Sequence, residues 1–523
     1  MAQWCRDARR ESRPAGETVA GPVRFPSGRA VRAIPRPIRL EPGDFFVRLP
    51  SSSSPAWVLA ETATAAVFSL LSMLVIGRVI GPQAAGTGMI AIAAFALLDM
   101  FGATLFPDAL VQRRAANGRH AASALTFAVL VGCVSGLVLA IGGPILATHA
   151  GAPEIAELCH VLAPLLPFSA FAGAGAGLLL RRQRFAPLAC RVLVGQPLAL
   201  IVGLWLAGHG YGPWAMIANQ AIATIVAFLV VLGFGRLWLR PMLDRAALRD
   251  LWPVAVPQVT AVAVLIGRYR LFLLALGLIT TEAVLAVSHF AFRMLDAALV
   301  VVWQATGRIA MPRLCALQGD REALAENFGD LAQLQALLGM PMAAGIALTA
   351  PDLVQALLGP AWYGSAQAAQ IVGLAALLTF VHGDTLTLFV ARGKARWNVW
   401  INLGALMVPL ATLLILQPQT ASGAALAWAS QSLVLPPILT WLVLREVRRP
   451  LSWLLRRIAP AVVATGAMTA VVLALELILR LPAAVELVMA AVLGGGVYVA
   501  VAWSMLKGRL PRALLRHPIP AAA

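Results

Sequence analysis

The chain has 523 residues, of which 60% are hydrophobic and only 12% are charged, and its mean hydropathy is +0.82. Soluble domains carry about 25% charged residues, so this composition excludes a set of soluble domains and predicts an all-α polytopic membrane protein. The net charge of +18 does not indicate nucleic-acid binding, because the basic residues form short clusters between apolar runs.

No group of residues in the sequence suggests catalysis or a cofactor. The cysteines are odd in number and far apart, a pattern that indicates neither disulfides nor a metal site; they are Cys5, Cys133, Cys159, Cys190 and Cys315. Neither a Ser–His–Asp arrangement nor a nucleotide-binding loop emerges. We therefore expect no enzyme activity, no cofactor and no metal.

Residues 1–54 are basic, contain several Pro and Gly residues and end in a run of serines. Such a segment cannot bury enough apolar surface to fold, and it has no apolar core of the kind that a signal peptide carries. We predict a disordered cytoplasmic tail. A translation start further downstream is the alternative interpretation.

Apolar runs of about 20 residues, the length that crosses a bilayer as a helix, follow one another from residue 56 to residue 506. We predict fourteen transmembrane helices. Their expected bounds are 56–77, 86–111, 121–148, 155–180, 188–207, 213–235, 252–278, 283–305, 329–350, 364–390, 397–416, 421–444, 458–479 and 483–506.

The basic residues predict the orientation of these spans. Of the 41 Lys and Arg residues, only Arg78 and Arg480 fall in the odd-numbered connections between spans. The tail, the even-numbered connections and the C-terminus carry nearly all the others. Because cytoplasmic loops are enriched in Lys and Arg, we expect both termini in the cytoplasm.

The spans divide into two predicted lobes of six helices. Arg181, Gly212 and Gln220 recur at a constant offset as Arg392, Gly423 and Gln431, which indicates an internal repeat. The expected parts are an N-lobe (55–235), a cytoplasmic linker (236–251), a C-lobe (252–445), two additional spans (446–510) and a cytoplasmic tail (511–523). Residues 241–251 are amphipathic and predict an interfacial helix, and a second amphipathic stretch, 321–335, precedes span nine.

Residues 262–297 contain the most unusual feature of the sequence, which is a group of ionisable side chains at membrane depth. Insertion of each charged group costs roughly 2.5–3.5 kcal/mol, so such groups usually face a cavity or a partner. Arg268, Arg270 and Arg293 are the basic residues well inside predicted spans. Packing against an acidic partner, or reaching to the interface, is the alternative for each of them.

Helix geometry limits how these groups can be arranged. Arg268 and Arg270 are two positions apart and cannot share one helix face, so we expect at most one to point inward. His289, Arg293 and Asp296 fall on one stripe of span eight. A histidine beside charges is suited to carrying a coupling proton, and a simple packing role is the alternative.

Three further polar groups lie at membrane depth: Asp99 in span two, and His382 with Asp384 in span ten. Each is a candidate for ion coupling or for pairing with a charge of the other lobe. Packing is the alternative for all three. Pro253 and Pro257 lie in span seven, where proline predicts a bend that suits a gating helix.

Three stretches of the sequence resemble one family over about residues 55–510. They are RVIGPQAAG (78–86) with LVQRR (110–114), LLLRRQRF (178–185) with GYGPWAMIANQ (210–220), and WLRP (238–241) with DRAALR (244–249). Together they resemble bacterial polysaccharide flippases of the multidrug/oligosaccharidyl-lipid/polysaccharide exporter superfamily, especially the colanic-acid type of exopolysaccharide repeat-unit exporter. The match is weaker in the C-lobe.

The resemblance implies a flippase that moves an undecaprenyl-diphosphate-linked oligosaccharide for exopolysaccharide, capsule or O-antigen (lipopolysaccharide) synthesis. It implies alternating access of two lobes around a central cavity, contact with membrane lipids, proton or sodium coupling, and a functional link to a polymerase and glycosyltransferases. Arginine binds phosphate bidentately and stays charged, so Arg268, Arg270 and Arg293 are the expected diphosphate-binding residues.

Two other functions remain as alternatives. A cation-coupled multidrug exporter of the same superfamily would favour an acidic cavity, which the intramembrane arginines oppose. A polysaccharide polymerase would need a large outer loop or catalytic carboxylates, and the longest predicted outer loop, about residues 350–364, is small.

Overall fold

The computed structural model describes residues 51–54, 56–113, 116–235, 241–317, 319–394, 396–478 and 482–509. Almost all of the predicted N-terminal tail and all of the predicted tail 511–523 lie outside these residues. The described helices belong to one compact unit that begins at Ser52.

Every regular element of the described residues is a helix, which confirms the all-α class. The first group is α2 (Ala56–Ala103), α3 (Pro107–Gln112), α4 (Gly118–Ala150), α5 (Glu154–Leu162), α6 (Leu165–Arg181), α7 (Phe185–Gly208) and α8 (Trp214–Gly235). The second group is α9 (Arg245–Leu265), α10 (Gly267–Ile279), α11 (Glu282–Ala316), α12 (Arg321–Leu357), η1 (Pro360–Trp362), α13 (Gly364–Ala376), η2 (Leu377–Phe380), α14 (Thr385–Ala391), α15 (Arg396–Leu416) and α16 (Ala421–Val447). The last group is α17 (Leu451–Ile478), α18 (Ala483–Met489), η3 (Ala490–Gly494) and α19 (Gly495–Met505).

Twelve helices of the described residues are long and apolar enough to cross a membrane, or 13 if the bent pair α9–α10 is one span. The first of them contains two predicted spans. A straight helix of the 48 residues of α2 would be about 72 Å long, more than twice the bilayer core of about 30 Å. The backbone leaves the helical conformation at Gly81 (φ 78°), which glycine tolerates because it has no Cβ.

The two arms of α2 lie next to each other, because Ile76 before this break and Met89 after it line the same cavity. With α9–α10 counted as one span and the two arms of α2 counted as two, the 12 helices give the fourteen predicted spans.

Capping side chains explain where several helices begin. The Asn117 side chain accepts hydrogen bonds from the backbone of Arg119 and His120 at the start of α4. Asp244 and Asp320 cap α9 and α12 in the same way. These caps satisfy backbone N–H groups that have no partner within the helix.

The predicted interfacial helix at residues 241–251 is not separate, since α9 begins at Arg245 and runs without interruption to Leu265. Part of the apolar side of this segment packs against protein, while Met242 and Leu243 are exposed. Leu251 is buried in the cluster that includes Phe106, and the Trp252 ring lies 6.0 Å from the ring of Phe106. The second amphipathic stretch is likewise the first part of α12.

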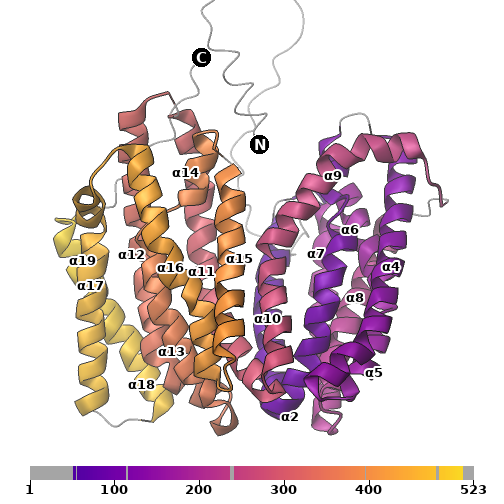
Figure 1. Ribbon diagram of the computed structural model, residues 1–523, viewed down its shortest axis with the longest axis horizontal. Coiled ribbons are helices and arrows are strands. Elements are labelled where there is room, and N and C mark those ends of the chain that lie inside the picture. The colour runs from indigo at the N-terminus through magenta and orange to yellow at the C-terminus, as the bar shows by residue number, and fades with distance from the viewer. Residues whose placement is uncertain are drawn as a thin grey trace, which may run out of the picture. The chain divides into compact units, whose positions relative to one another are not determined.

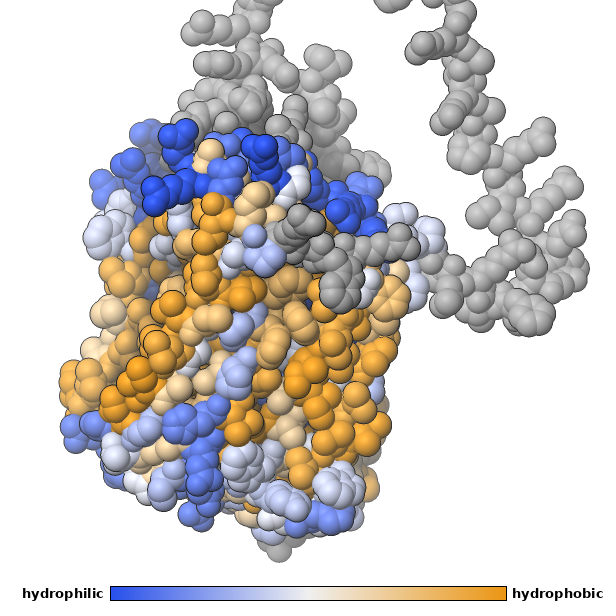
Figure 2. Space-filling model, turned by 90° about the vertical axis from the view of Figure 1, so that its right-hand side faces the viewer, coloured by the Kyte–Doolittle hydropathy of each residue, from blue (hydrophilic) through white to orange (hydrophobic). Residues whose placement is uncertain are grey.

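Within the compact unit, α4 to α8 pack together on the right of Figure 1 and α11 to α17 pack together on the left. Helix α10 lies between them and contacts both α2 and α15 (Figure 1). Figure 2 shows an apolar band between two hydrophilic ends. Large apolar side chains are exposed to the surroundings, including Ile415 (81%) and Leu477 (84%), as expected for helices that contact lipid.

Candidate functional site

A cavity of about 560 Å³ lies between two groups of helices, α2 to α8 and α10 to α16. Its walls come from α2, α7, α8, α10, α11 and α16. Five of the eight predicted site residues line it: Arg268, Arg270, Arg293, His289 and Asp296. The structure therefore brings together residues that the sequence placed on two consecutive spans.

The cavity lies at mid-membrane depth. Arg268 is eleven residues before the end of α10 at Ile279, which corresponds to about 17 Å along the helix axis. Arg293 is eleven residues after the start of α11 at Glu282, again about 17 Å. Both distances are close to half of a bilayer core of about 30 Å.

Arg268 and Arg270 both line the cavity, so the expectation that at most one points inward is wrong. Both residues belong to the start of α10, directly after the 46° bend between α9 and α10. Ile266, Arg268, Tyr269 and Arg270 all contribute to the wall. The cavity therefore surrounds the first turn of α10 instead of lying along one face.

The side-chain hydrogen bonds of the arginines go to uncharged groups. Arg268 Nη1 donates a hydrogen bond to Gln431 Oε1 at 3.4 Å, and Arg293 Nη2 donates to Ser69 Oγ at 3.1 Å. Arg270 has no side-chain hydrogen bond to any described residue. Within the described part of the chain, none of the three forms an ion pair within 4.0 Å. Asp296 is the single carboxylate among the lining residues.

An aromatic cluster holds His289 at the edge of this cationic wall. The Tyr269 hydroxyl lies 2.8 Å from His289 Nδ1, and the two rings stack at 5.8 Å. Trp428 packs edge-on against Tyr269 at 5.2 Å. His289 thus hydrogen-bonds to a neutral hydroxyl, and Asp296 lines the same cavity two turns further along α11.

Another part of the lining is polar but uncharged, and sequence reasoning did not identify it; we call it the uncharged wall. It contains Ser69, Ser72, Gln196, Asn219 and Gln220. Asn219 Nδ2 donates to Ser72 Oγ at 3.4 Å. The adjacent amides Asn219 and Gln220 within an apolar span were the available signal, because an amide in a membrane helix also seeks a partner.

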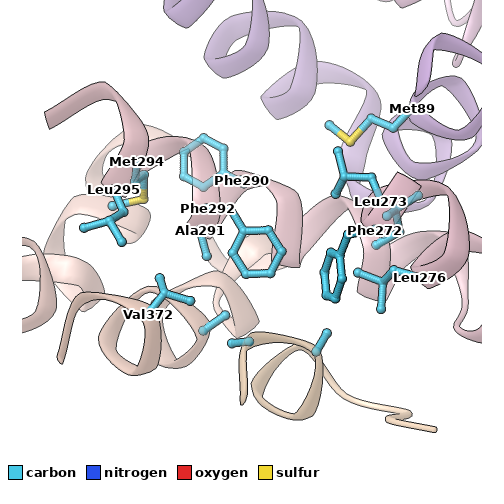
Figure 3. Packing of buried hydrophobic residues seen from close by; sticks show 14 of the residues in the cluster. Met89, Phe272, Leu273, Leu276, Phe290, Ala291, Phe292, Met294, Leu295 and Val372 are labelled. Carbon is cyan, nitrogen blue, oxygen red and sulfur yellow. The ribbon is translucent and has the colours of Figure 1, made fainter. Parts of the chain in front are cut away.

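The cavity ends at an apolar floor. Met89 of α2 and Leu273 of α10 lie next to each other in Figure 3 and also line the cavity. They belong to a buried cluster that continues through Phe272, Leu276 and Phe290.

Beyond this floor the two groups of helices are in close contact. A Cβ atom added at Gly86 would lie 1.9 Å from the carbonyl oxygen of Glu282. Arg78 Nη1 donates to the carbonyl oxygen of Leu357 at 3.1 Å. The cavity is therefore closed toward the end where α2 turns and α11 begins, which we call the gate end.

Asp99, His382 and Asp384 lie outside the cavity lining. Asp384 caps α14 by accepting from the backbone N–H of Thr387 at 3.2 Å, and His382 Nδ1 lies 2.8 Å from Thr385 Oγ1. These are contacts of helix capping and packing. One carboxylate oxygen of Asp99 is buried without a hydrogen-bond partner among the described residues.

The polysaccharide biosynthesis protein family matches residues 75–367, which is more than half of the chain. A relative, the succinoglycan biosynthesis transport protein ExoT of Rhizobium meliloti (strain 1021), is 25% identical over 169 residues. That match covers 32% of this chain and 34% of the relative, so the chain spans about a third of the relative's length.

Two solved structures share the fold. The lipid II flippase MurJ in an inward closed conformation has a TM-score of 0.71 and 12% identity, covering 88% of this chain and 100% of that chain. An inward-facing multidrug resistance MATE family transporter of the MOP superfamily has a TM-score of 0.61 and 15% identity, covering 75% and 98%. At such identities the likeness concerns the fold alone.

The resemblance that the sequence motifs indicated is thus confirmed by the family match and by the fold. Because that match extends over more than half of a chain with the fold of MOP-superfamily transporters, the chain belongs to the polysaccharide biosynthesis protein family and is a multi-pass protein of the bacterial inner membrane.

Proposed function

We propose that the chain moves an undecaprenyl-diphosphate-linked oligosaccharide repeat unit across the inner membrane for exopolysaccharide, capsule or O-antigen synthesis. The observation that carries this proposal is the cavity at mid-membrane depth, where Arg268, Arg270 and Arg293 have no acidic partner within 4.0 Å among the residues that the structure describes. The names of two similar proteins, a succinoglycan transport protein and a lipid II flippase, support the same class of cargo.

A diphosphate matches the chemistry of this cavity. Arginine side chains bind phosphate oxygens with two parallel hydrogen bonds and remain charged at any physiological pH. The N-terminus of α10 also faces the cavity, and the first turn of a helix favours an anion. A bound diphosphate would offset the cost of holding three cations at membrane depth.

The charge of the lining argues against the multidrug alternative. An exporter of cationic drugs needs acidic groups in its cavity, whereas three arginines here face one carboxylate, Asp296. The uncharged wall formed by α2, α7 and α8 suits the hydroxyl groups of a sugar, because hydroxyls and amides both donate and accept hydrogen bonds. We assign the arginine wall to the diphosphate and the uncharged wall to the sugar.

The closed gate end supports a mechanism of alternating access. We propose that the N-lobe (55–235) and the C-lobe (252–445) move relative to each other, with the cytoplasm on the side where the arginine clusters lie. The structure then corresponds to a state closed toward the periplasm. Opening would require separation of Gly86 from Glu282 and of Arg78 from Leu357, which are contacts between the lobes.

Replacing Arg270 with Gln tests the diphosphate site. Charge-assisted hydrogen bonds contribute about 1.5–3 kcal/mol, so the variant should bind undecaprenyl diphosphate at least about tenfold more weakly than the wild type, as measured by isothermal titration calorimetry of the purified protein. Arg270→Lys should lose less, since it keeps the charge. Arg445→Gln, outside the cavity and stacked on Trp441, is the matched control. Equal affinities of Arg270→Gln and wild type would contradict the assignment.

Replacing Gly86 with Leu tests the gate. The new side chain cannot fit against Glu282 in this state, so the population should shift toward the outward-open state. In a background without the native cysteines, Ser72→Cys in the cavity should then react several-fold faster with a membrane-impermeant maleimide added outside the cell. Gly142→Leu, where an added Cβ meets no atom within 4 Å, serves as the control. Unchanged labelling at equal protein levels would show that this contact does not close the cavity.

We propose that His289 and Asp296 couple transport to protons, with sodium coupling as the alternative. His289 is held by the Tyr269 hydroxyl beside the arginines, so protonation of Nδ1 would reverse that hydrogen bond, with Nδ1 donating to the hydroxyl oxygen, and would add a fourth cation. His289→Ala and Asp296→Asn should each flatten the pH dependence of transport in proteoliposomes. Tyr269→Phe, which removes only the hydroxyl, should shift that dependence without abolishing it. Wild-type pH profiles in both variants would remove the coupling role.

A further inference from the structure

A second cavity, of about 840 Å³, lies at the ends of α12, α17 and α19 that carry the basic clusters. Five cations line it, against the single lining carboxylate Asp330; the cations are Arg449, Arg456, Arg457, Lys507 and Arg509. It shares no lining residue with the mid-membrane cavity.

Two of these cations are already paired with acids of α12. Arg457 contacts both Glu326 and Asp330 and lies 5.1 Å from the ring centre of Trp453. Arg449 Nη2 lies 3.0 Å from Glu322 Oε1. These pairs hold α17 against α12 and form the back wall of the cavity.

The other three cations, Arg456, Lys507 and Arg509, have no side-chain hydrogen bond or ion pair to any described residue. Lys507 and Arg509 stay close to α17 because the chain turns directly after α19. Lys507 (φ 54°) and Gly508 (φ 66°) are both left-handed there. Three uncompensated positive charges therefore converge on one cavity, and a ligand that fits it carries negative charge.

The surroundings of the cavity are apolar on the side away from α12. Leu455 of α17 and Trp503 of α19 are exposed large side chains of the helices that line the cavity, and Met505 and Leu506 form part of its lining. A ligand that satisfies both the cations and this surface has an anionic head and an apolar tail. A soluble phosphate compound would leave the apolar surface uncovered.

We propose that this cavity binds the phosphate headgroup of an anionic phospholipid, with the acyl chains along the exposed faces of α17 and α19. Basic residues at a membrane surface attract anionic lipids, and here they form a cavity instead of a flat patch. The bound phospholipid would link the end of α19 to the start of α17. This site is independent of the proposed cargo, so either proposal can fail without the other.

The test compares two triple variants of the full chain with equal loss of charge. The first is Arg456→Gln/Lys507→Gln/Arg509→Gln. The control is Arg119→Gln/Arg245→Gln/Arg249→Gln, which removes three exposed arginines from α4 and α9. Native mass spectrometry in detergent with added phosphatidylglycerol should show retention of the lipid by wild type and control, and about tenfold lower occupancy in the first variant.

Three outcomes would overturn the proposal. Equal loss in both variants would mean that phosphatidylglycerol binds only through the overall charge of the protein. Displacement of phosphatidylglycerol by inorganic diphosphate at equal concentration would identify a site for soluble anions. Retention of undecaprenyl diphosphate in the presence of excess phosphatidylglycerol would identify a docking site for the cargo. Phosphatidylcholine should not compete in any arm.

Discussion

The central physical constraint on this protein is the cost of three arginines at mid-membrane depth that share their cavity with a single carboxylate, Asp296. Arg268 and Arg270 are two positions apart in α10 and point to different faces of that helix. Both still line the cavity, because it extends around the beginning of α10, directly after the break at Ile266. The bend, the cavity and the cationic wall are thus parts of one arrangement, and the aromatic packing of Tyr269 and Trp428 keeps it in place.

The protein uses arginine in two different ways, and the partners distinguish them. Arg457 lies between Glu326 and Asp330, and its contacts hold α17 against α12. Arg270 lines a cavity and has no such partner among the described residues. A paired arginine can be explained by packing, but an unpaired one at membrane depth leaves an energetic cost that a ligand offsets. This contrast is why the mid-membrane arginines, and not the far more numerous ones at the helix ends, indicate the cargo.

The helices were predictable from the sequence, because apolar run length and basic-residue placement are local properties of a chain in a bilayer. The predicted break at residues 279–282 corresponds to the separation of α10 from α11. The uncharged wall with Asn219 and the burial of Leu251 against α3 and α4 were not predictable, since they depend on which helices become neighbours. The amphipathic pattern of residues 241–251 fits both lipid and protein contact, and only tertiary packing decides between them.

The most direct test of the central claim is to locate the undecaprenyl-linked repeat units in a strain that lacks this gene. The account predicts that complete units accumulate in the cytoplasmic leaflet, that the wild-type gene clears them, and that Arg293→Ala does not. Units that reach the periplasmic leaflet and remain unpolymerised in the deletion strain would contradict the account, because the missing step would then follow translocation.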